Sequence, residues 1–324
     1  MQEIQAKMKA RAKELLESGQ VARVIGWKKG EFIYDNSPAT FESVEELDNF
    51  VYDYFCGSNL SKYLIAESKK PGKTAVFLKP CDTYSYNQLI KEHRINKDNV
   101  YVIAIECLAK LNAETIKNLA DGFVTGVSVE GDKVTISSPY GEKVVDKKDV
   151  LLTKCSTCSK THVAGDEQII VYNFEKPSTD RFEKVKELEA MTEDERFAFW
   201  RSQLSKCIRC NACRNVCPAC SCVKCVFDNP ASGISAKAND DKFEEQLFHV
   251  IRAFHVSGRC TDCGECSRVC PQNIPLHLLN RKFIKDINQT YGEYQAGEET
   301  EGKTPLTSYT VNDAEPNEVV NGGK

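Results

Sequence analysis

The chain has 324 residues, of which 41% are hydrophobic and 28% charged, and its formal net charge at pH 7 is −4. This length allows two modest domains. The mild negative charge argues against a broad basic face, so we expect no nucleic-acid partner. No apolar run has the length needed to cross a bilayer, so we also expect no membrane span.

The cysteine content is the unusual feature, because the chain contains 16 cysteines. A secreted disulfide scaffold would carry a signal peptide, but residues 1–18 are charged throughout and predict an amphipathic helix. In the reducing cytoplasm, cysteine-rich chains hold metal rather than disulfides. We therefore expect a cytoplasmic metal-binding protein.

Residues 1–174 predict a mixed α/β domain with a partly parallel sheet. Residues 21–27 and 31–35 alternate in the manner of a β-hairpin. A helix is expected to begin near Ser43, where Glu46 would complete a capping box.

Two nearly continuous apolar runs follow, at residues 74–80 and 99–106. Such runs are typical of strands buried on both faces of a parallel sheet. The helical pattern at 83–95 between them predicts a βαβ unit. Cys81 and Cys107 come directly after the two runs, in what we expect to be turns. Sites in open α/β sheets lie beyond the carboxyl ends of the strands, so this placement indicates function.

The rest of the chain divides by composition. Residues 128–148 predict an antiparallel insertion, and 168–173 a further strand. Residues 175–202 are highly charged and predict a helical linker. The cysteine-dense module spans 203–287, and 288–324 predict an acidic, disordered tail.

Two cysteine runs in the module carry the strongest signal. Each has the spacing C-x2-C-x2-C-x3-C-P, the bacterial ferredoxin run whose fourth cysteine ligates the other of two clusters. The predicted ligands of one [4Fe–4S] cluster are therefore Cys207, Cys210, Cys213 and Cys270, and those of the other are Cys260, Cys263, Cys266 and Cys217. A pair of zinc sites is the alternative, but zinc ribbons need neither a third cysteine nor the C-x3-C-P ending.

The segment between the runs contains an amphipathic helix at 243–256, so we predict an elaborated, α-rich version of a bacterial ferredoxin domain. His249 and His255 on this helix are expected to be packing or surface residues.

The remaining cysteines leave alternatives open. Cys81, Cys107, Cys155 and Cys158 could close a third [4Fe–4S] site or could be inert and buried. Two roles are open for the cysteines that directly follow the first run. They could ligate a further metal, or they could shield the neighbouring cluster; they are Cys220, Cys222 and Cys225. Cys56 is expected to be structural.

A family resemblance appears in the order Pro80-Cys81, Glu106-Cys107 and Cys155-x2-Cys158. With these motifs, residues 45–175 resemble the β subunits of coenzyme F420-reducing hydrogenases and F420-dependent formate dehydrogenases. In that family the matching cysteines hold a [4Fe–4S] cluster beside a flavin. The resemblance therefore implies a third cluster and, less strongly, FAD, because residues 82–85 depart from the flavin-binding members. The second half is similar to the iron–sulfur subunit of anaerobic sulfite reductase.

These features predict an iron–sulfur electron-transfer subunit of an anaerobic oxidoreductase complex. It would relay single electrons between a partner subunit and another carrier. The expected partner is a dehydrogenase or hydrogenase, or else a heterodisulfide-reductase-like flavoprotein. No catalytic residue is assigned, and whether the chain is itself an enzyme stays open. The alternatives are a flavin-containing reductase subunit that exchanges hydride with F420 or a nicotinamide, and a zinc-stabilised docking scaffold.

Overall fold

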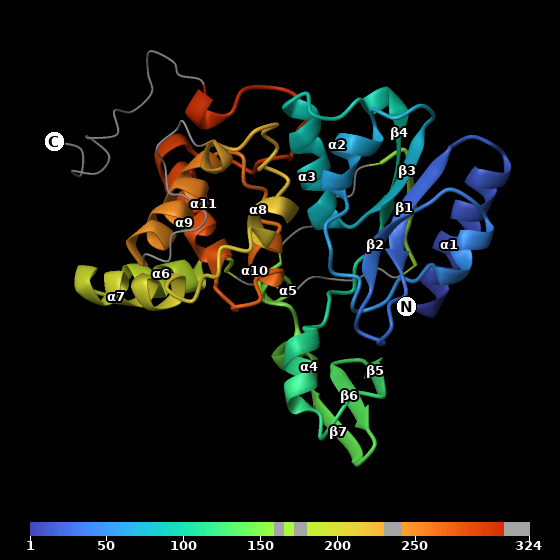
Figure 1. Ribbon diagram of the computed structural model, residues 1–324, viewed down its shortest axis with the longest axis horizontal. Coiled ribbons are helices and arrows are strands. Elements are labelled where there is room, and N and C mark those ends of the chain that lie inside the picture. The colour runs from blue at the N-terminus through green and yellow to red at the C-terminus, as the bar shows by residue number, and fades with distance from the viewer. Residues whose placement is uncertain (159–164, 172–179, 230–241, 308–324) are drawn as a thin grey trace. The chain divides into compact units, whose positions relative to one another are not determined.

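The computed structural model describes residues 1–158, 165–171, 180–229 and 242–307 (Figure 1). The chain forms two compact units. Unit 1 comprises residues 1–83 and 95–179, and unit 2 comprises residues 84–94 and 180–324.

Unit 1 is built on a five-stranded mixed sheet with strand order β2-β1-β3-β4-β8. The strands are β1 (Arg23–Lys28), β2 (Ser37–Phe41), β3 (Thr74–Leu78), β4 (Val100–Ile105) and β8 (Glu167–Ile169). Only β2 runs antiparallel to its neighbour. Strand β3 is buried along its whole length, as its unbroken apolar sequence requires. The predicted parallel pair around a helix is confirmed, because β3 and β4 pair in parallel and α3 (Pro80–Lys91) connects them.

Helices in unit 1 are short apart from α1 (Gln2–Glu17), whose buried stripe of Ile4, Met8, Ala12 and Leu15 repeats at helical spacing. This helix contacts β1 and β8. The other helical segments of unit 1 are α2 (Leu64–Glu67), α4 (Ala113–Leu119), α5 (Thr153–Ser156) and the 3-10 turns η1 (Glu45–Asn49), η2 (Ser61–Tyr63), η3 (Lys97–Asn99) and η4 (Lys147–Val150).

Two local predictions in this region are wrong. The hairpin partner of β1 is Ser37–Phe41 rather than 31–35, because Ile33 and Tyr34 pack against a separate hydrophobic cluster instead of the sheet. The helix expected from Ser43 is the 3-10 turn η1, without a side-chain cap. The Glu46 carboxylate instead accepts a hydrogen bond from the Glu42 amide at 2.7 Å.

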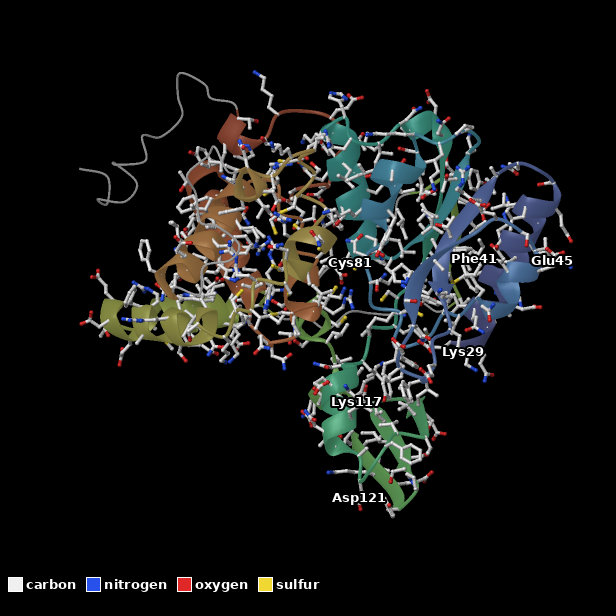
Figure 2. The ribbon with its side chains drawn as sticks, viewed as in Figure 1. Lys29, Phe41, Glu45, Cys81, Lys117 and Asp121 are labelled. Carbon is white, nitrogen blue, oxygen red and sulfur yellow. The ribbon has the colours of Figure 1, made fainter. Side chains whose placement is uncertain are left out.

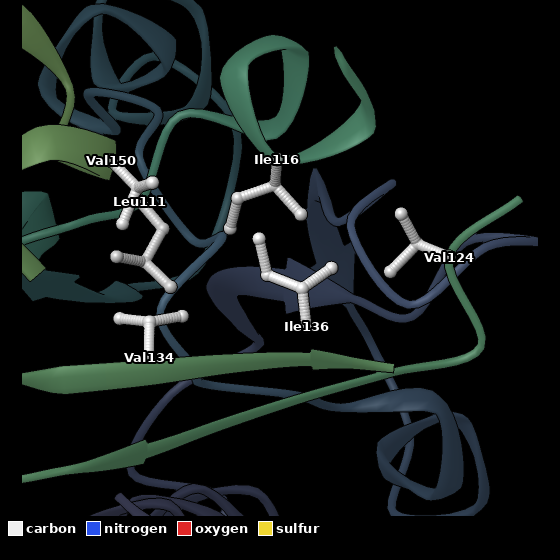
Figure 3. Close-up of a cluster of buried hydrophobic side chains, with 6 residues drawn as sticks. All are labelled: Leu111, Ile116, Val124, Val134, Ile136 and Val150. Carbon is white, nitrogen blue, oxygen red and sulfur yellow. The ribbon is translucent and has the colours of Figure 1, made fainter. Parts of the chain in front are cut away.

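The antiparallel insertion is confirmed. Strands β5 (Gly126–Glu130), β6 (Lys133–Ser138) and β7 (Gly141–Asp146) form a separate three-stranded sheet. Its core is shown in Figure 3 and consists of Leu111, Ile116, Val124, Val134, Ile136 and Val150. The strand expected at 168–173 is confirmed only in part, because β8 begins at Glu167 and ends at Ile169, so residues 170 and 171 are not in a strand; residues 172 and 173 lie outside the described residues.

Unit 2 is largely helical. Its helices are α6 (Glu183–Glu189), α7 (Glu193–Leu204), α8 (Ala212–Val216), α9 (Lys242–His255), α10 (Glu265–Arg268) and α11 (Leu276–Tyr291), with 3-10 turns η5 (Val226–Asp228) and η7 (Pro305–Thr307). The expected helix between the cysteine runs is α9. Two helices form within the expected linker, but Val185 and Leu188 of α6 are buried against Leu278 of α11. The described part of the linker therefore belongs to the core of unit 2.

The tail prediction is wrong for residues 288–307, because α11 continues to Tyr291 and the segment that follows it is packed. Ala296 is buried, and the Tyr294 hydroxyl donates a hydrogen bond to the Gly258 carbonyl at 3.2 Å. Gly297 has a φ of +78°, and a Cβ there would lie 1.8 Å from the Tyr84 carbonyl oxygen. A few small and aromatic residues thus hold an otherwise polar segment against unit 2. The rest of the predicted tail, 308–324, lies outside the described residues. None of the described helices is both long and apolar enough to cross a membrane.

Candidate iron–sulfur centres

The two cysteine runs fold into the same backbone turn. Arg209 and Asp262, each just before the second cysteine of its run, have φ values of 54° and 56°. Asn211 and Gly264, just after that cysteine, have φ values of 60° and 68°. Alternating left-handed residues turn successive amides toward one point, a geometry that binds anions and iron–sulfur clusters. The short helices α8 and α10 then begin at equivalent places.

The thiols of the first predicted set line a single cavity in unit 2. Its walls include Phe248, His249 and Leu276 and all four predicted ligands, Cys207, Cys210, Cys213 and Cys270. The Arg209 amide donates a hydrogen bond to the Cys207 sulfur at 3.3 Å. Four thiols with amide N–H···S contacts are the donor set of a thiolate-bound cubane.

The second predicted set also meets, and it includes the cysteine from the other run. The pKa of Cys260 is raised well above its ordinary value, by burial and by the charges of Asp262 and the thiols of Cys217 and Cys263. Burial likewise raises the pKa of Cys266 to about 12, again with Cys217 and Cys263 contributing. Cys217 therefore lies with the second run, and Cys270 with the first, as the crossed arrangement requires.

Buried ion pairs hold each cluster-binding loop, and the sequence did not reveal them. Arg209 of the first loop lies 3.7 Å from Glu245 of α9. Asp262, at the equivalent position of the second loop, pairs with Arg281 of α11 at 2.8 Å. The same loop position is thus fixed by a helix in both runs, with the charges reversed.

Ligation must displace protons at these sites. Burial raises the pKa of Cys207 to about 12 and that of Cys213 to about 11, so both thiols are protonated at neutral pH without metal. Iron binds thiolates, so cluster assembly releases these protons.

The third predicted set lies in unit 1 at the carboxyl ends of β3 and β4. Cys81 was expected in a turn but lies at the start of helix α3 (Figure 2). The helix begins at Pro80, because proline suits the first helical position. The Leu152 amide donates a hydrogen bond to the Lys110 carbonyl at 2.8 Å, and the Cys155 amide donates one to the Leu152 carbonyl at 2.7 Å. These bonds bring α5 beside the segment that follows β4.

The thiols of this set interact with one another. Burial raises the pKa of Cys155 to about 12, and the next largest effects are the charges of Cys107 and Lys154. The pKa of Cys81 is raised well above its ordinary value by burial and by Asp82, with a smaller contribution from Cys107. Cys158 also contributes to raising the pKa of Cys155. The structure therefore brings the four predicted cysteines into one neighbourhood.

Three lysines surround this neighbourhood, and the sequence alone did not reveal them. Lys79 and Lys110 are buried, and their ammonium groups donate hydrogen bonds to the Ser58 and Asp53 carbonyls at 2.7 and 2.6 Å. Lys79 and Lys154 both lower the pKa of Cys81, opposing the effect of burial. Lys79 also pairs with the Asp82 carboxylate at 2.6 Å, whereas burial lowers the pKa of Lys110.

The three cysteines that follow the first run differ in their surroundings. Cys220 packs in the hydrophobic cluster that contains Cys217 and Val256. Cys222 is exposed, and Cys225 contributes to raising the pKa of Arg214. A further metal site formed by these three stays a prediction, and Cys220 fits the alternative expectation of shielding a neighbouring cluster.

Cys56 is buried, and its thiol contacts groups of its own turn. It accepts a hydrogen bond from the Asp53 amide at 3.4 Å and donates to the Val51 carbonyl at 3.7 Å. Burial raises its pKa to about 12. These local contacts fit the structural role expected for it.

Comparisons with known proteins agree with the cysteine geometry. Residues 203–274 match the family model of the 4Fe-4S dicluster domain. The chain is 25% identical to the β subunit of the F420-dependent formate dehydrogenase of Methanocaldococcus jannaschii, over 86% of this chain and 88% of that subunit. It is also 25% identical to the β subunit of F420-dependent formate dehydrogenase 1 of Methanococcus maripaludis, over 91% of each chain.

Among solved structures, a chain of the F420-reducing [NiFe] hydrogenase complex of Methanosarcina barkeri aligns with a TM-score of 0.38 at 15% identity, over 48% of this chain and 62% of that one. The expected resemblance to the β subunits of F420-dependent formate dehydrogenases is confirmed by the two relatives that match over most of the chain. The similarity to the iron–sulfur subunit of anaerobic sulfite reductase stays a prediction.

Proposed function

We propose that this chain is the iron–sulfur electron-transfer subunit of a formate-dehydrogenase-like, F420-linked oxidoreductase. The carrying observation is that the two dicluster cysteine runs fold into matching turns whose thiols come together in the crossed pattern. Relatives over most of the chain are named as β subunits, which supports a hetero-oligomer with redox partner subunits. We propose a cytoplasmic location, with an F420 β-subunit-like domain at 1–174 and a ferredoxin-like domain at 203–287.

The residues of unit 2 fit this role. When bound, thiolate-held cubanes accept and release one electron at a time without a change of ligands. The left-handed turns of both runs direct amides toward the thiols, and such N–H···S bonds favour the more negative, reduced state. The buried ion pairs of Arg209 and Asp262 keep the loops in place, so little reorganisation accompanies electron transfer.

We propose that the third set, Cys81, Cys107, Cys155 and Cys158, holds a third [4Fe–4S] cluster. The support is the convergence of thiols from three separate chain segments beside buried lysines. Lys79 is compensated by the Asp82 carboxylate, but Lys110 is desolvated, donates to the Asp53 carbonyl and lies near Cys107, and thiolate ligation would compensate its charge. A third site gives unit 1 a redox centre of its own through which a partner subunit exchanges electrons.

The test is the iron, sulfide, zinc and flavin content of anaerobically purified protein, with its electron paramagnetic resonance spectrum after dithionite reduction. Three cubanes correspond to about twelve irons per chain, and two correspond to about eight. We expect Cys81→Ser to lose about four irons, since one of four ligands is removed. The matched control Cys56→Ser, also a cysteine of unit 1, should lose none. Zinc in place of iron in the unmodified chain would refute the electron-transfer function.

A second candidate is favoured by one observation, the F420 dependence named for both relatives. F420 carries a hydride and hence two electrons, whereas a cubane takes one electron at a time. A flavin converts between the two modes, so a chain that itself reacts with F420 would hold FAD. One flavin per chain, and bleaching of the visible spectrum by reduced F420 alone, would favour this reductase function. Clusters without flavin would favour the electron-transfer function.

A further inference from the structure

Helix α9, inserted between the two cysteine runs, buries a polar face. Glu245, His249 and Arg252 follow one another at about one-turn spacing and are only 4%, 1% and 2% exposed. Ordinary packing helices bury apolar stripes, and Glu and Arg are almost never fully buried unless they are paired. The face must therefore be directed at something other than apolar protein.

The charges on this face are unequally compensated. Glu245 lies 3.7 Å from Arg209 of the first cluster-binding loop. For the Arg252 guanidinium, no residue in the described part of the chain accepts a hydrogen bond from Nε, Nη1 or Nη2. An arginine has five N–H donors and cannot escape the cost of burial by losing its proton. A buried cation without hydrogen-bond acceptors is strongly unfavourable, so its acceptors must be supplied by the site it faces.

The neighbours of Arg252 along the chain identify that site, because His249 lines the cavity of the first cysteine set and Val256, one turn beyond Arg252, packs in a cluster with Cys217 and Cys260. Burial opposes the charge of Arg252, yet its pKa is raised, because the sulfur atoms of Cys266, Cys213, Cys217 and Cys220, when they are thiolates, outweigh the burial. Cys213 belongs to the first predicted ligand set, and Cys217 and Cys266 belong to the second. The same guanidinium is therefore close to thiols of both clusters, and so is Cys220, which belongs to neither set.

We propose that Arg252 is a shared counter-charge for the two clusters, donating N–H···S hydrogen bonds to sulfur atoms of both and setting both reduction potentials. The inference rests on the proposed function, since it requires both cubanes. Reduction of a cluster adds one electron and no proton, so the cluster gains one negative charge. A fixed guanidinium stabilises the reduced state of each cluster, and its removal lowers both potentials.

Arg252 is a positioning residue rather than a catalytic one, and its effect is measurable as a potential. The experiment is an anaerobic redox titration of the full-length, cluster-loaded protein, followed by electron paramagnetic resonance, for the unmodified chain and for Arg252→Gln and Arg252→Lys. The matched control is Arg201→Gln, which removes the same charge from an exposed position on α7 of the same unit.

For Arg252→Gln we expect the equilibrium constant for reduction of each of the two clusters to fall about tenfold, which is about 59 mV for a one-electron couple. Arg252→Lys keeps the charge but not the planar fork, so its potentials should lie between those of the unmodified and Gln proteins. Arg201→Gln should leave both potentials within the error of the titration.

Unchanged potentials in Arg252→Gln, or a shift confined to one cluster, would overturn the proposal. If Arg252→Gln fails to hold iron, full iron content in Arg252→Lys supports a requirement for the charge. Loss of iron from both variants shows that the side chain acts by its shape alone and overturns the proposal. Absence of any cubane signal from the unmodified chain would instead refute the proposed function.

Discussion

Replacing Lys79 by methionine removes one partner of the most deeply buried ion pair among the described residues of unit 1. The Lys79 ammonium lies 2.6 Å from the Asp82 carboxylate, and the two side chains are 1% and 0% exposed. The ammonium also donates a hydrogen bond to the Ser58 carbonyl at 2.7 Å and lies 4.4 Å from the centroid of the Trp27 ring. Asp82 follows Cys81 directly, so the pair supports the third predicted ligand set.

The magnitude follows from burial. Removing one member of a buried pair leaves the other charge uncompensated, which costs roughly 3–5 kcal/mol. For a unit of 150–250 residues each kcal/mol lowers the melting temperature by about 2–4 °C, so Lys79→Met should lower it by roughly 6–20 °C. Asp82→Asn should cost a similar amount, because it strands the ammonium instead. The double variant removes both charges and should be more stable than either single variant.

The assay is thermal unfolding of the anaerobically purified protein, followed by circular dichroism at one scan rate for all variants. Lys133→Met is the matched control, because Lys133 and Asp146 form the same kind of pair at 2.5 Å with 63% and 41% of the side chains exposed. Exposed pairs contribute about 0–1 kcal/mol, so the control should barely shift. Equal shifts in Lys79→Met and Lys133→Met, or strictly additive effects in the double variant, would refute the reasoning.

Other parts of the molecule allow three further predictions. Cys263→Ser should lose one cluster, and the melting temperature of the whole dicluster module should fall because each cluster joins both runs. The control Cys222→Ser changes an exposed cysteine outside both sets and should keep full iron content. Thr192→Ala removes the capping box of α7 and should cost about 1 kcal/mol in thermal unfolding; no measurable change would show that tertiary contacts alone hold this helix. His277 has its pKa lowered to about 4 by burial and by Arg281, so its stabilising effect is complete above its unfolded pKa near 6.5 and is lost as pH falls through 4. Between pH 7 and pH 5 the unmodified protein should lose about 2 kcal/mol more than His277→Gln, and equal losses would contradict this assignment.

The cysteine spacing alone predicted dicluster chemistry for unit 2, and the match of residues 203–274 to the 4Fe-4S dicluster domain agrees with it. Three cysteines at C-x2-C-x2-C spacing must sit on one tight loop, and the fourth, on the far side of a short helix, cannot reach back to the same cluster. The matching left-handed turns at Arg209 and Asp262 agree with that local geometry. Similarly, the unbroken apolar runs of β3 and β4 required burial on both faces, so their parallel pairing could be predicted.

Local patterns failed where side chains pack against distant segments. Residues 31–35 alternate like a strand, but Ile33 and Tyr34 pack on the core of the inserted sheet, which the sequence places far along the chain. The polar residues 292–307 have the composition of a disordered segment, yet they are held by burial of Ala296 and by the close approach of Gly297 to Tyr84. Hydrophobic periodicity and composition describe only the segment in which a residue lies. These contacts depend on a second segment that is distant in the sequence.

The charges around the centres were decided by tertiary structure alone. Arg252, Lys79 and Lys110 look like ordinary surface residues in the sequence, because a basic residue in a helix or loop is usually solvated. Folding buries Arg252 beside thiols of both cysteine runs, and it buries Lys79 and Lys110 beside Cys56 as well as beside the nearby Cys81 and Cys107. Ligand spacing is a short-range property of the chain and can be read from it. Electrostatic compensation acts through space between residues far apart in sequence, so only the folded structure reveals it.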